Sequence, residues 1–385
     1  MVRILLCMDT STEYNRAIIR GIISYSQTHD NCLLLSRVPS CLLAESPERK
    51  DKIEQWIKDW GINAIIVGLL SYDDLLPLSN LDISVVLQNT SVQPERISTI
   101  NEEYIITGQI AADFFINKKY INFAYFGLKN IYWSEERARG FRNEVRRHNV
   151  TYNEYMVETN TIDEESKITK WLTNLQKPVA IFCCNDKHAL VISELCHIAK
   201  IDVPQEVSIL GVDNDELICN VSNPPLSSLT LNVENAGYET GHLLHSLENI
   251  ESKSSFVVSI KPGIVVQRGS TQKHNVKDKE VSKMLEYIDA NYTHSISTKD
   301  VFSQDFLCRR AAEIRFKEMT DMTVYKYLTE QRLNHLCTLM ETTNLSLAEC
   351  ASRSGISSLN YLFHLFKKNF GCSPNEWRKS RRKKS

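Results

Sequence analysis

Carboxylate, amide and guanidinium side chains follow several short apolar runs of this 385-residue chain. Asp186 comes after one such run, and Asp213 and Asn214 come directly after the next. Arg137 lies some ten residues beyond an earlier run. A carboxylate accepts hydrogen bonds from hydroxyl groups, and a guanidinium donates them in a planar fork. These residue types therefore predict a site for a small, hydroxyl-rich ligand.

Further ligand candidates lie near the first apolar run and in a later loop. Tyr14 and Arg16 follow residues 4–8, and Trp133 with its neighbour Tyr132 can supply an apolar platform for one face of such a ligand. Three other interpretations compete with this one. Asp186 can simply cap the next helix, the aromatic side chains can belong to the local core, and Asp186 with Asp213 can act as the acid and nucleophile of a glycosidase.

A second set of polar side chains, near the carboxyl end, suits DNA. Asn360 can bond adenine through two hydrogen bonds, His364 can donate to guanine or phosphate, and Leu359 can contact a thymine methyl group. Cations nearby suit backbone phosphates. The full set of predicted DNA-contacting residues is Arg309, Arg310, Glu313, Ser357, Ser358, Leu359, Asn360, His364, Lys367, Lys368 and Arg378.

The elements that must position the ligand candidates alternate along residues 1 to about 270. Apolar runs typical of buried strands alternate with helical patterns, which predicts doubly wound parallel sheets in two lobes. Ligands of such sheets bind beyond the carboxyl ends of the strands, where these candidates lie. The predicted strands cover residues 4–8, 64–69, 84–87, 123–126, 179–184 and 207–212.

The DNA candidates lie on a predicted helix-turn-helix. Ser346 and Glu349 can form a capping box, and Gly355 permits the sharp exit from the first helix. A second helix starts at Ser357 or Ser358, and a third starts near Pro374, with Trp377 as its core anchor.

An upstream, degenerate copy of this motif has a cap at Ser297 and a second helix over about residues 308–319. Its turn, residues 304–307, contains no glycine, so base contacts by this copy are in doubt. One long helix over about residues 324–340 joins the two copies.

Charge and composition support this division. The chain is 42% hydrophobic and 24% charged, which is ordinary for a globular protein, and no apolar stretch approaches the length of a membrane span. From Val276 onward 19 Lys and Arg face 13 Asp and Glu, a net charge of +6, whereas the rest carries −8. The eleven cysteines form no C-x-x-C pair, so we expect no zinc site or other metal, no cofactor, and a reducing, cytoplasmic location.

Three resemblances sharpen these expectations. Residues 355–378, with Gly-Ile-Ser-Ser, Phe-Lys-Lys and Ser-Pro-Asn-Glu-Trp-Arg, resemble the AraC family's DNA-binding domain. Arg137–Phe141, residues 180–190 and residues 207–230 resemble the LacI/GalR sugar-sensing core, a periplasmic-binding-protein-like fold. The order of the two parts resembles the XylR-type family of xylose operon regulators. Residues 101–104 depart from the Asp-Asn usual in the sensing family, which leaves the sugar's identity open.

The resemblances imply a non-enzymatic, sugar-responsive transcription regulator. The effector would be a pentose, D-xylose, and the other partners an operator in double-stranded DNA, a second copy of the chain and, for an activator, RNA polymerase. The expected divisions are a sensing domain over residues 1–269, a linker over 270–279 and an all-α DNA-binding domain over 280–385. A regulator of another sugar or an oligosaccharide, and a cytoplasmic sugar-binding protein or sugar-processing enzyme, remain as alternatives.

Overall fold

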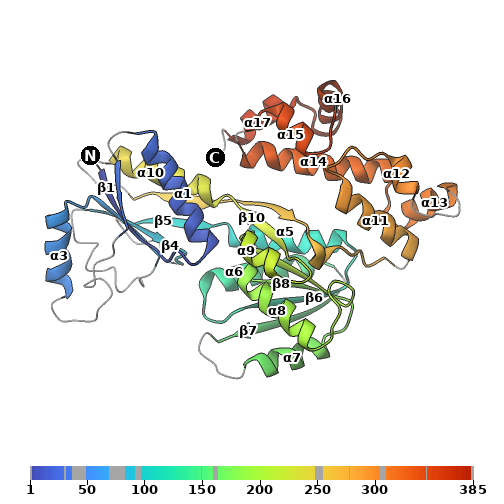
Figure 1. Ribbon diagram of the computed structural model, residues 1–385, viewed down its shortest axis with the longest axis horizontal. Coiled ribbons are helices and arrows are strands. Elements are labelled where there is room, and N and C mark those ends of the chain that lie inside the picture. The colour runs from blue at the N-terminus through green and yellow to red at the C-terminus, as the bar shows by residue number, and fades with distance from the viewer. Residues whose placement is uncertain are drawn as a thin grey trace.

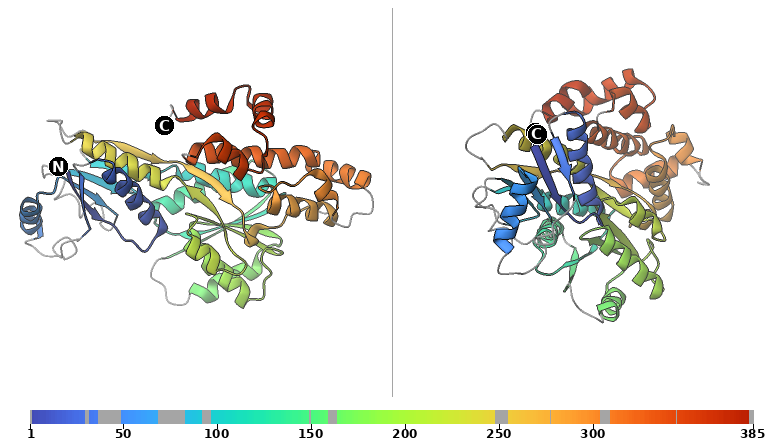
Figure 2. Two further views of the ribbon diagram at one scale, coloured as in Figure 1. Left: turned by 45° about the horizontal axis from the view of Figure 1, so that its top comes forward. Right: turned by 60° about the vertical axis from the view of Figure 1, so that its left-hand side comes forward.

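Two α/β lobes and a helical unit make up the structure, a computed structural model (Figure 1). It describes residues 2–29, 32–36, 49–68, 83–91, 97–148, 150–158, 164–247, 255–276, 278–303, 309–343 and 345–382. The first lobe lies at the left of Figure 1, the second below the centre, and the helical unit at the upper right. The two views in Figure 2 show the helical unit close to the second lobe and away from the outer end of the first.

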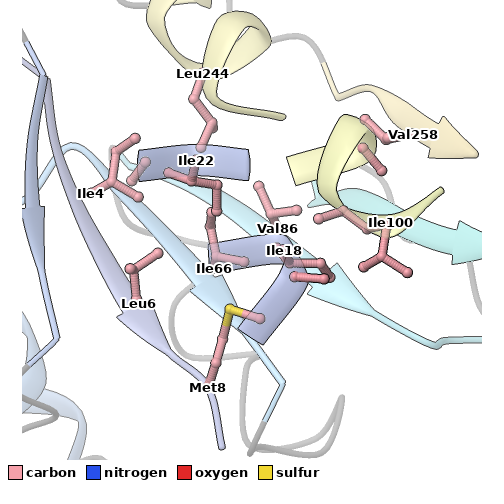
Figure 3. Packing of buried hydrophobic residues seen from close by; sticks show 14 of the residues in the cluster. Ile4, Leu6, Met8, Ile18, Ile22, Ile66, Val86, Ile100, Leu244 and Val258 are labelled. Carbon is pink, nitrogen blue, oxygen red and sulfur yellow. The ribbon is translucent and has the colours of Figure 1, made fainter. Parts of the chain in front are cut away.

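The first lobe contains a parallel sheet with strand order β11-β5-β4-β3-β1-β2. Alternate side chains of each strand enter different cores. Ile4 and Leu6 pack beneath α1 and α10, together with Ile18 and Leu244 (Figure 3), whereas Leu5 faces the α3 side. Both faces are covered, as in doubly wound folds. The strands are β1 (Val2–Cys7), β2 (Cys32–Leu35), β3 (Ala64–Val67), β4 (Ser84–Gln88), β5 (Ile97–Glu102) and β11 (Val257–Ile260), and the helices are α1 (Glu13–Gln27), α3 (Arg49–Trp60) and α10 (Val233–Leu247).

The second lobe repeats this plan with the order β12-β10-β9-β8-β6-β7. All its strand pairs are parallel except that of β12 with β10. The chain passes between the lobes after Glu102, after Leu231 and after Ile260. The strands are β6 (Asn122–Leu128), β7 (Thr151–Val157), β8 (Val179–Cys183), β9 (Val207–Val212), β10 (Ser227–Leu231) and β12 (Pro262–Val266), and the helices are α5 (Tyr104–Asn117), α6 (Tyr132–Val145), α7 (Glu164–Asn174), α8 (Asp186–Ile198) and α9 (Glu216–Val221).

The predicted parallel sheets are confirmed, and each of the six predicted strands overlaps an observed one. The sequence prediction missed the interior strands β5 and β10 and the edge strands β2, β7, β11 and β12. The edge strands were missed for a physical reason. The residues of these strands are partly exposed, so they lack a continuous apolar run. No helix in the described ranges is both long and apolar enough to cross a membrane.

The helical unit contains the helices of two helix-turn-helix motifs, which α14 joins; the turn of the first motif lies outside the described residues. The N-terminal part of α14, with Val324 and Leu328, packs in the first motif's core, and its later residues Leu336 and Met340 pack in the second. The predicted boxes at Ser346 and Ser297 are present, and Trp377 is buried. The helices are α11 (Lys279–Asn291), α12 (Thr298–Phe302), α13 (Arg309–Thr320), α14 (Val324–Thr342), α15 (Leu347–Arg353), α16 (Leu359–Phe370) and α17 (Pro374–Arg382).

One contact fixes the two motifs relative to each other. Arg332 of α14 donates to the carbonyl oxygens of Tyr292 at 2.8 Å, His294 at 2.7 Å and Ile296 at 2.8 Å, all of which follow α11. Gly355, with φ +72°, lies against the same backbone, where a Cβ would collide with the Tyr292 carbonyl. The turn glycine therefore serves both the sharp exit of α15 and the close approach of the two motifs.

The predicted turn at residues 304–307 and the predicted start of the following helix at Cys308 lie outside the described residues.

Residues 270–274, the first part of the expected linker, pack against the second lobe and do not form an exposed tether. Ser270, Thr271 and His274 are buried, and the Ser270 hydroxyl donates to the Ile209 carbonyl at 2.7 Å, because the short helix Gly269–Thr271 packs on β9.

The paired glycines Gly355 and Gly371 give a matched test of this packing. Both adopt φ near +72°, but an added Cβ at Gly371 meets nothing within 4 Å. Gly371→Ala should therefore lower the free energy of unfolding only by the cost of a left-handed backbone conformation for alanine, about 1–2 kcal/mol. Gly355→Ala should cost clearly more, because it also forces the two motifs apart. Hydrogen exchange of the α11 and α15 amides in the full chain measures both, and equal effects would mean that the close contact does not contribute.

Candidate functional site

A buried ion pair joins the two lobes where β5 leads into α5. The Arg137 Nε on α6 donates to Glu102 Oε1 at 3.1 Å, and its Nη2 pairs with the other carboxylate oxygen. Its Nη1 donates to the Cys184 carbonyl, and the Thr107 hydroxyl adds a bond of 2.5 Å to Glu102. Burial opposes the charge of Arg137, but Glu102 and Asp213 outweigh this and raise its pKa above the ordinary value. Arg137 is therefore held rigid and charged.

Close packing of α5 on α6 makes this pair possible. A Cβ at Gly108 would collide with the Arg137 carbonyl, and a Cβ at Gly140 would collide with the Ile105 carbonyl. Two glycines facing each other thus let the helix backbones touch. The consequence is that Arg137 reaches the carboxyl end of a strand in the other lobe.

Aromatic rings surround the guanidinium. Arg137 lies 5.2 Å from the centre of the Trp133 ring and 5.9 Å from that of Tyr104. Tyr132 packs edge-on against Tyr104, with ring centres 5.8 Å apart. These are cation–π and edge-to-face geometries. Trp133 thus lies beside the predicted ligand residue Arg137, although part of its face is used by that residue.

Asn89 accepts hydrogen bonds from tyrosine hydroxyl groups of both lobes. The Tyr14 hydroxyl donates to Asn89 Oδ1 at 3.1 Å, and the Tyr104 hydroxyl donates to the same oxygen at 2.7 Å. Burial, and then Tyr104 and Glu102, raise the pKa of Tyr14 well above its usual value, with smaller effects of Arg137 and Asp213. These side chains therefore form one cluster.

Sequence reasoning missed Asn89, Glu102 and Tyr104 as members of this cluster. A sequence signal was present for Asn89, because it follows the predicted strand at residues 84–87 as the other ligand candidates follow theirs. Glu102 and Tyr104 fall in the segment that departs from the family pattern, so no residue there was assigned.

Backbone strain marks the end of β9. Asp213 and Asn214 both have positive φ, 101° and 53°, and neither is glycine. Such residues cost on the order of 1–3 kcal/mol each and cluster at functional sites. Asp213 lies 3.9 Å from Arg137, and burial raises its pKa well above the usual range although Arg137 opposes this. Asn214 is held by Arg268, which donates to its side-chain oxygen at 2.9 Å.

The predicted ligand residue Asp186 is held by hydrogen bonds within the second lobe, and its charge contributes to the raised pKa of Asp213. Asn185, not Asp186, caps α8. The Asp186 carboxylate accepts from the Ser228 hydroxyl at 2.5 Å and from the Asp215 amide at 2.8 Å, with 1% of the residue exposed. Burial raises its pKa to about 7, despite these hydrogen bonds.

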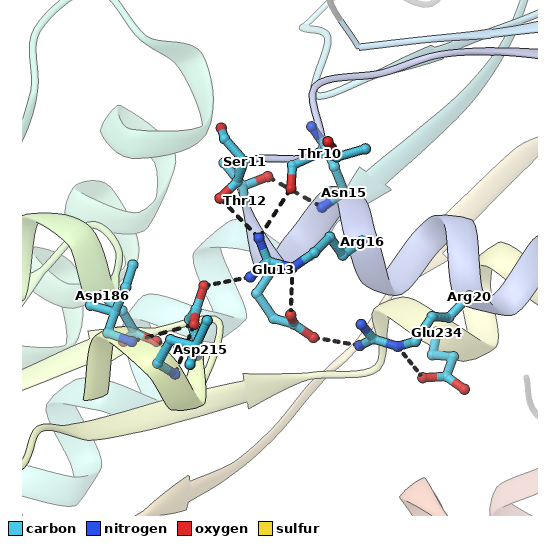
Figure 4. A network of polar contacts seen from close by, with 12 residues as sticks. Thr10, Ser11, Thr12, Glu13, Asn15, Arg16, Arg20, Asp186, Asp215 and Glu234 are labelled. Atoms are coloured by element: carbon cyan, nitrogen blue, oxygen red, sulfur yellow. Dashed lines mark hydrogen bonds and ion pairs between the residues drawn. The ribbon is translucent and has the colours of Figure 1, made fainter. Parts of the chain in front are cut away.

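Arg16 also has a different role from the predicted one. Its guanidinium pairs with Glu13 at 3.1 Å and, across the lobes, with Asp215 at 2.8 Å (Figure 4). It further donates to the carbonyl oxygens of Thr10 and Ser11, both at 3.0 Å. With its nitrogens engaged in this way, Arg16 bridges the lobes instead of presenting donors to a ligand.

The second helix-turn-helix presents most of its predicted residues to solvent. Ser358 caps α16, and the predicted residues on this motif from Ser357 to Lys368 are exposed. On the upstream motif, Arg309 and Arg310 are exposed, but Arg309 is paired with Glu313 at 2.9 Å and stacks on Phe302. Asp321 stands where the resembled family has glycine and adopts the same left-handed conformation, φ 60°.

The half-exposed Arg378, a predicted phosphate contact, bonds the backbone of the helical unit. It donates to the carbonyl oxygens of Leu345 at 2.8 Å and Thr343 at 2.7 Å, which follow α14. Its role is to satisfy carbonyls beyond a helix end. Among the described residues no group of three or more His, Cys, Asp or Glu side chains could hold a metal ion.

The structural role of Asp186 can be tested directly. Asp186→Ala leaves the Ser228 hydroxyl and the Asp215 amide without their buried acceptor, so each should cost about 1–3 kcal/mol of unfolding free energy. Glu194→Ala, on the exposed face of α8, is the control. Denaturant unfolding measures both variants, and a stability of Asp186→Ala equal to wild type would contradict this role.

Comparison with known proteins follows the same division of the chain. Residues 112–271 match the model of the periplasmic binding protein-like domain, and residues 307–380 match that of a helix-turn-helix domain. The xylose operon regulatory protein of Haemophilus influenzae is 30% identical over 66% of this chain and 68% of its own length. That of Escherichia coli K12 is 27% identical over 98% of this chain and 96% of its own.

A solved structure has the same architecture. The xylose-binding transcription activator xylR covers 98% of both chains with a TM-score of 0.60 and 23% identity. The Escherichia coli relative and the solved structure thus each match this chain over both the lobes and the helical unit. This chain belongs to the family of the xylose operon regulatory proteins.

Proposed function

We propose that this chain is a cytoplasmic, sugar-responsive transcription regulator that binds a pentose, D-xylose, between its lobes and operator DNA through its helical unit. The observation that carries the proposal is the convergence of Tyr14, Asn89, Tyr104, Arg137 and Asp213 at the strand ends of two lobes, in a chain that also exposes α16. We further propose residues 1–269 as the sensor, 270–279 as the connection and 280–385 as the DNA-binding domain.

The cluster has the chemistry that an uncharged pentose needs. Asp213 supplies oxygen acceptors, Asn89 the N–H groups of its amide, and Arg137 the N–H groups that are not bonded to Glu102 or Cys184. The tyrosines, whose hydroxyls donate to Asn89, supply hydroxyl oxygens and apolar ring faces. The relatives named for xylose operons support the choice of sugar. Arabinose or an oligosaccharide is the alternative within the same class.

Helix α5 supports a mechanism of response. Its first residue, Tyr104, belongs to the cluster around Asn89 and Arg137, and Lys118, which follows its last turn, contacts the helical unit. The Lys118 ammonium pairs with Asp289 of α11 at 2.8 Å, and Asp289 also accepts from Tyr327 of α14 at 3.1 Å. A sugar that favours one arrangement of the lobes would thus favour one placement of the helical unit, in proportion to its differential affinity.

The enzyme alternative has less support. A glycosidase needs two carboxyl groups that both face the substrate, but both Asp186 oxygens are engaged within the second lobe. Dimer formation, and contact with RNA polymerase during activation, belong to the proposal as well. Light scattering of the purified chain tests the first of these.

Asp213→Asn tests the sugar site. It keeps the side-chain shape and tolerates the left-handed backbone, but it replaces one acceptor oxygen with an NH2 donor. D-xylose affinity should fall on the order of 3- to 10-fold, since one hydrogen bond contributes about 0.5–1.5 kcal/mol. Calorimetric titration with D-xylose and L-arabinose measures this, with Asp202→Asn on the exposed surface as control. If D-xylose does not bind the wild-type chain, the proposed effector is wrong.

Two substitutions on α16 test DNA binding by the full chain, with DNA selected from a random pool. Asn360→Ala should cost about 1–3 kcal/mol on the selected sequence and little on random DNA, because an amide recognises a base edge. Lys367→Ala should weaken both alike and lower the salt dependence by about one counterion. Fluorescence anisotropy at several salt concentrations distinguishes these patterns, and absence of a sequence preference in wild type would refute the regulator.

A further inference from the structure

Two large apolar side chains of α16 are exposed to solvent, although the helix already buries another face. Leu362, Leu365 and Phe366 pack in the core of the second motif. Leu359 and Phe363, one turn apart, are 42% and 39% exposed. Side chains four residues apart on a helix are neighbours, so these two form one apolar surface, the α16 patch. Figures 1 and 2 show α16 at the edge of the helical unit that lies away from the two lobes.

Ring packing does not account for the exposure of Phe363. Phe370, at the end of the same helix, is equally exposed, but its ring centre lies 4.4 Å from that of Phe366 and 6.0 Å from that of Trp377. In the described part of the chain Phe363 has no ring contact of this kind. The α16 patch is therefore available to a partner outside the helical unit.

The two helix-turn-helix motifs can be aligned residue by residue. Phe316 of α13 and Phe366 of α16 are both fully buried. Each is followed five residues later by a residue with left-handed backbone, Asp321 with φ 60° and Gly371 with φ 73°. Because this spacing is the same in both motifs, each position of α13 has an equivalent in α16.

The positions of α13 that are equivalent to the α16 patch are charged. They are Arg309 and Glu313, which form an ion pair at 2.9 Å. Charged side chains are usual on the exposed face of a helix. The fold of such a motif therefore does not require apolar side chains at these positions, and Leu359 and Phe363 have another role.

Polar and cationic side chains border the α16 patch. Asn360 lies three residues before Phe363 and Lys367 four residues after it, so both are neighbours of Phe363 on the helix surface, and both are exposed. An apolar protein partner would have to desolvate the Lys367 ammonium. The major groove of DNA instead offers phosphates along its rim and one apolar group among its base edges, the C5 methyl of thymine. Charge and apolar surface together thus fit DNA that contains thymine.

We propose that Leu359 and Phe363 contact the C5 methyl groups of two thymines in the major groove, which makes Phe363 a specificity-determining residue of the second motif. The inference rests on the proposed binding of operator DNA by α16. An adenine bound by Asn360 is paired with a thymine on the opposite strand, so the whole face selects a half-site rich in A·T pairs. Arg309 and Glu313 supply no apolar contact, so the upstream motif lacks this preference.

Replacement of thymine by deoxyuridine tests the α16 patch, because uracil differs from thymine only by the missing methyl group. Fluorescence anisotropy of the full chain is measured on DNA selected from a random pool, with one thymine replaced at a time. In wild type, replacement at two positions should weaken binding about fourfold each, as expected for one buried methyl group. In Phe363→Ala, replacement at one of these positions should have no further effect, because the side chain that contacts that methyl group is gone.

Asn360→Ala is the matched control on the same side of α16. It should weaken binding through the loss of hydrogen bonds but keep the effect of both uracil replacements. Ile198→Ala, at an exposed apolar residue of α8, should change neither quantity. Circular dichroism checks the folding of each variant, and Phe363→Glu, which introduces the residue type that α13 has at the equivalent position, replaces Phe363→Ala if that variant does not fold.

An equal effect of uracil in wild type and in Phe363→Ala, or no effect of any single replacement in wild type, overturns the inference, while a sequence preference still supports the regulator. Absence of any sequence preference in wild type refutes the proposed function and this inference together. A lower molar mass of Phe363→Ala in light scattering, with the uracil effects unchanged, means that the α16 patch binds a second copy of the chain, which also overturns the inference.

Discussion

The buried ion pair of Glu102 and Arg137 is the interaction on which the arrangement of the two lobes depends. It joins the end of a first-lobe strand to a second-lobe helix with both side chains almost fully buried. Burying charges in this way is costly, and removing one partner of such a pair costs about 3–5 kcal/mol because the other remains uncompensated. The pair therefore brings specificity of position more than stability, and it places Trp133, Tyr104 and Asp213 around one point.

The same region begins the path to the helical unit. Helix α5 starts with Tyr104, which bonds Asn89 in the cluster around Arg137, and is followed by Lys118, whose ammonium is buried against Asp289 and His274. Lys118 and His274 together lower the pKa of Asp289 below its usual range, although burial opposes this. Two buried charge clusters thus lie at the ends of one helix, and each ties together parts of the chain that are far apart in sequence.

The two motifs of the helical unit are joined by α14, a single helix that enters both of their cores. Arg332, on that helix, bonds three carbonyls of the first motif beside the turn glycine of the second. Asp321 keeps the left-handed turn of the upstream motif without glycine, at a cost that Asp tolerates better than most residues. The departure from glycine at Asp321 therefore leaves the left-handed turn after α13 in place.

The sequence by itself determined what local rules control: the parallel sheets, the capping boxes at Ser346 and Ser297, the glycine turn, and the loops that carry the ligand residues. Tertiary structure decided which side chains from those loops meet. Asp186 and Arg16 have side chains that could bind a sugar, but Asp186 accepts a hydrogen bond from Ser228, and Arg16 pairs with Asp215. Asn89 joins the cluster because the hydroxyl groups of Tyr14 and Tyr104, on two different helices, donate to it. Hydrogen-bond partners are set by long-range packing, which neither periodicity nor spacing encodes.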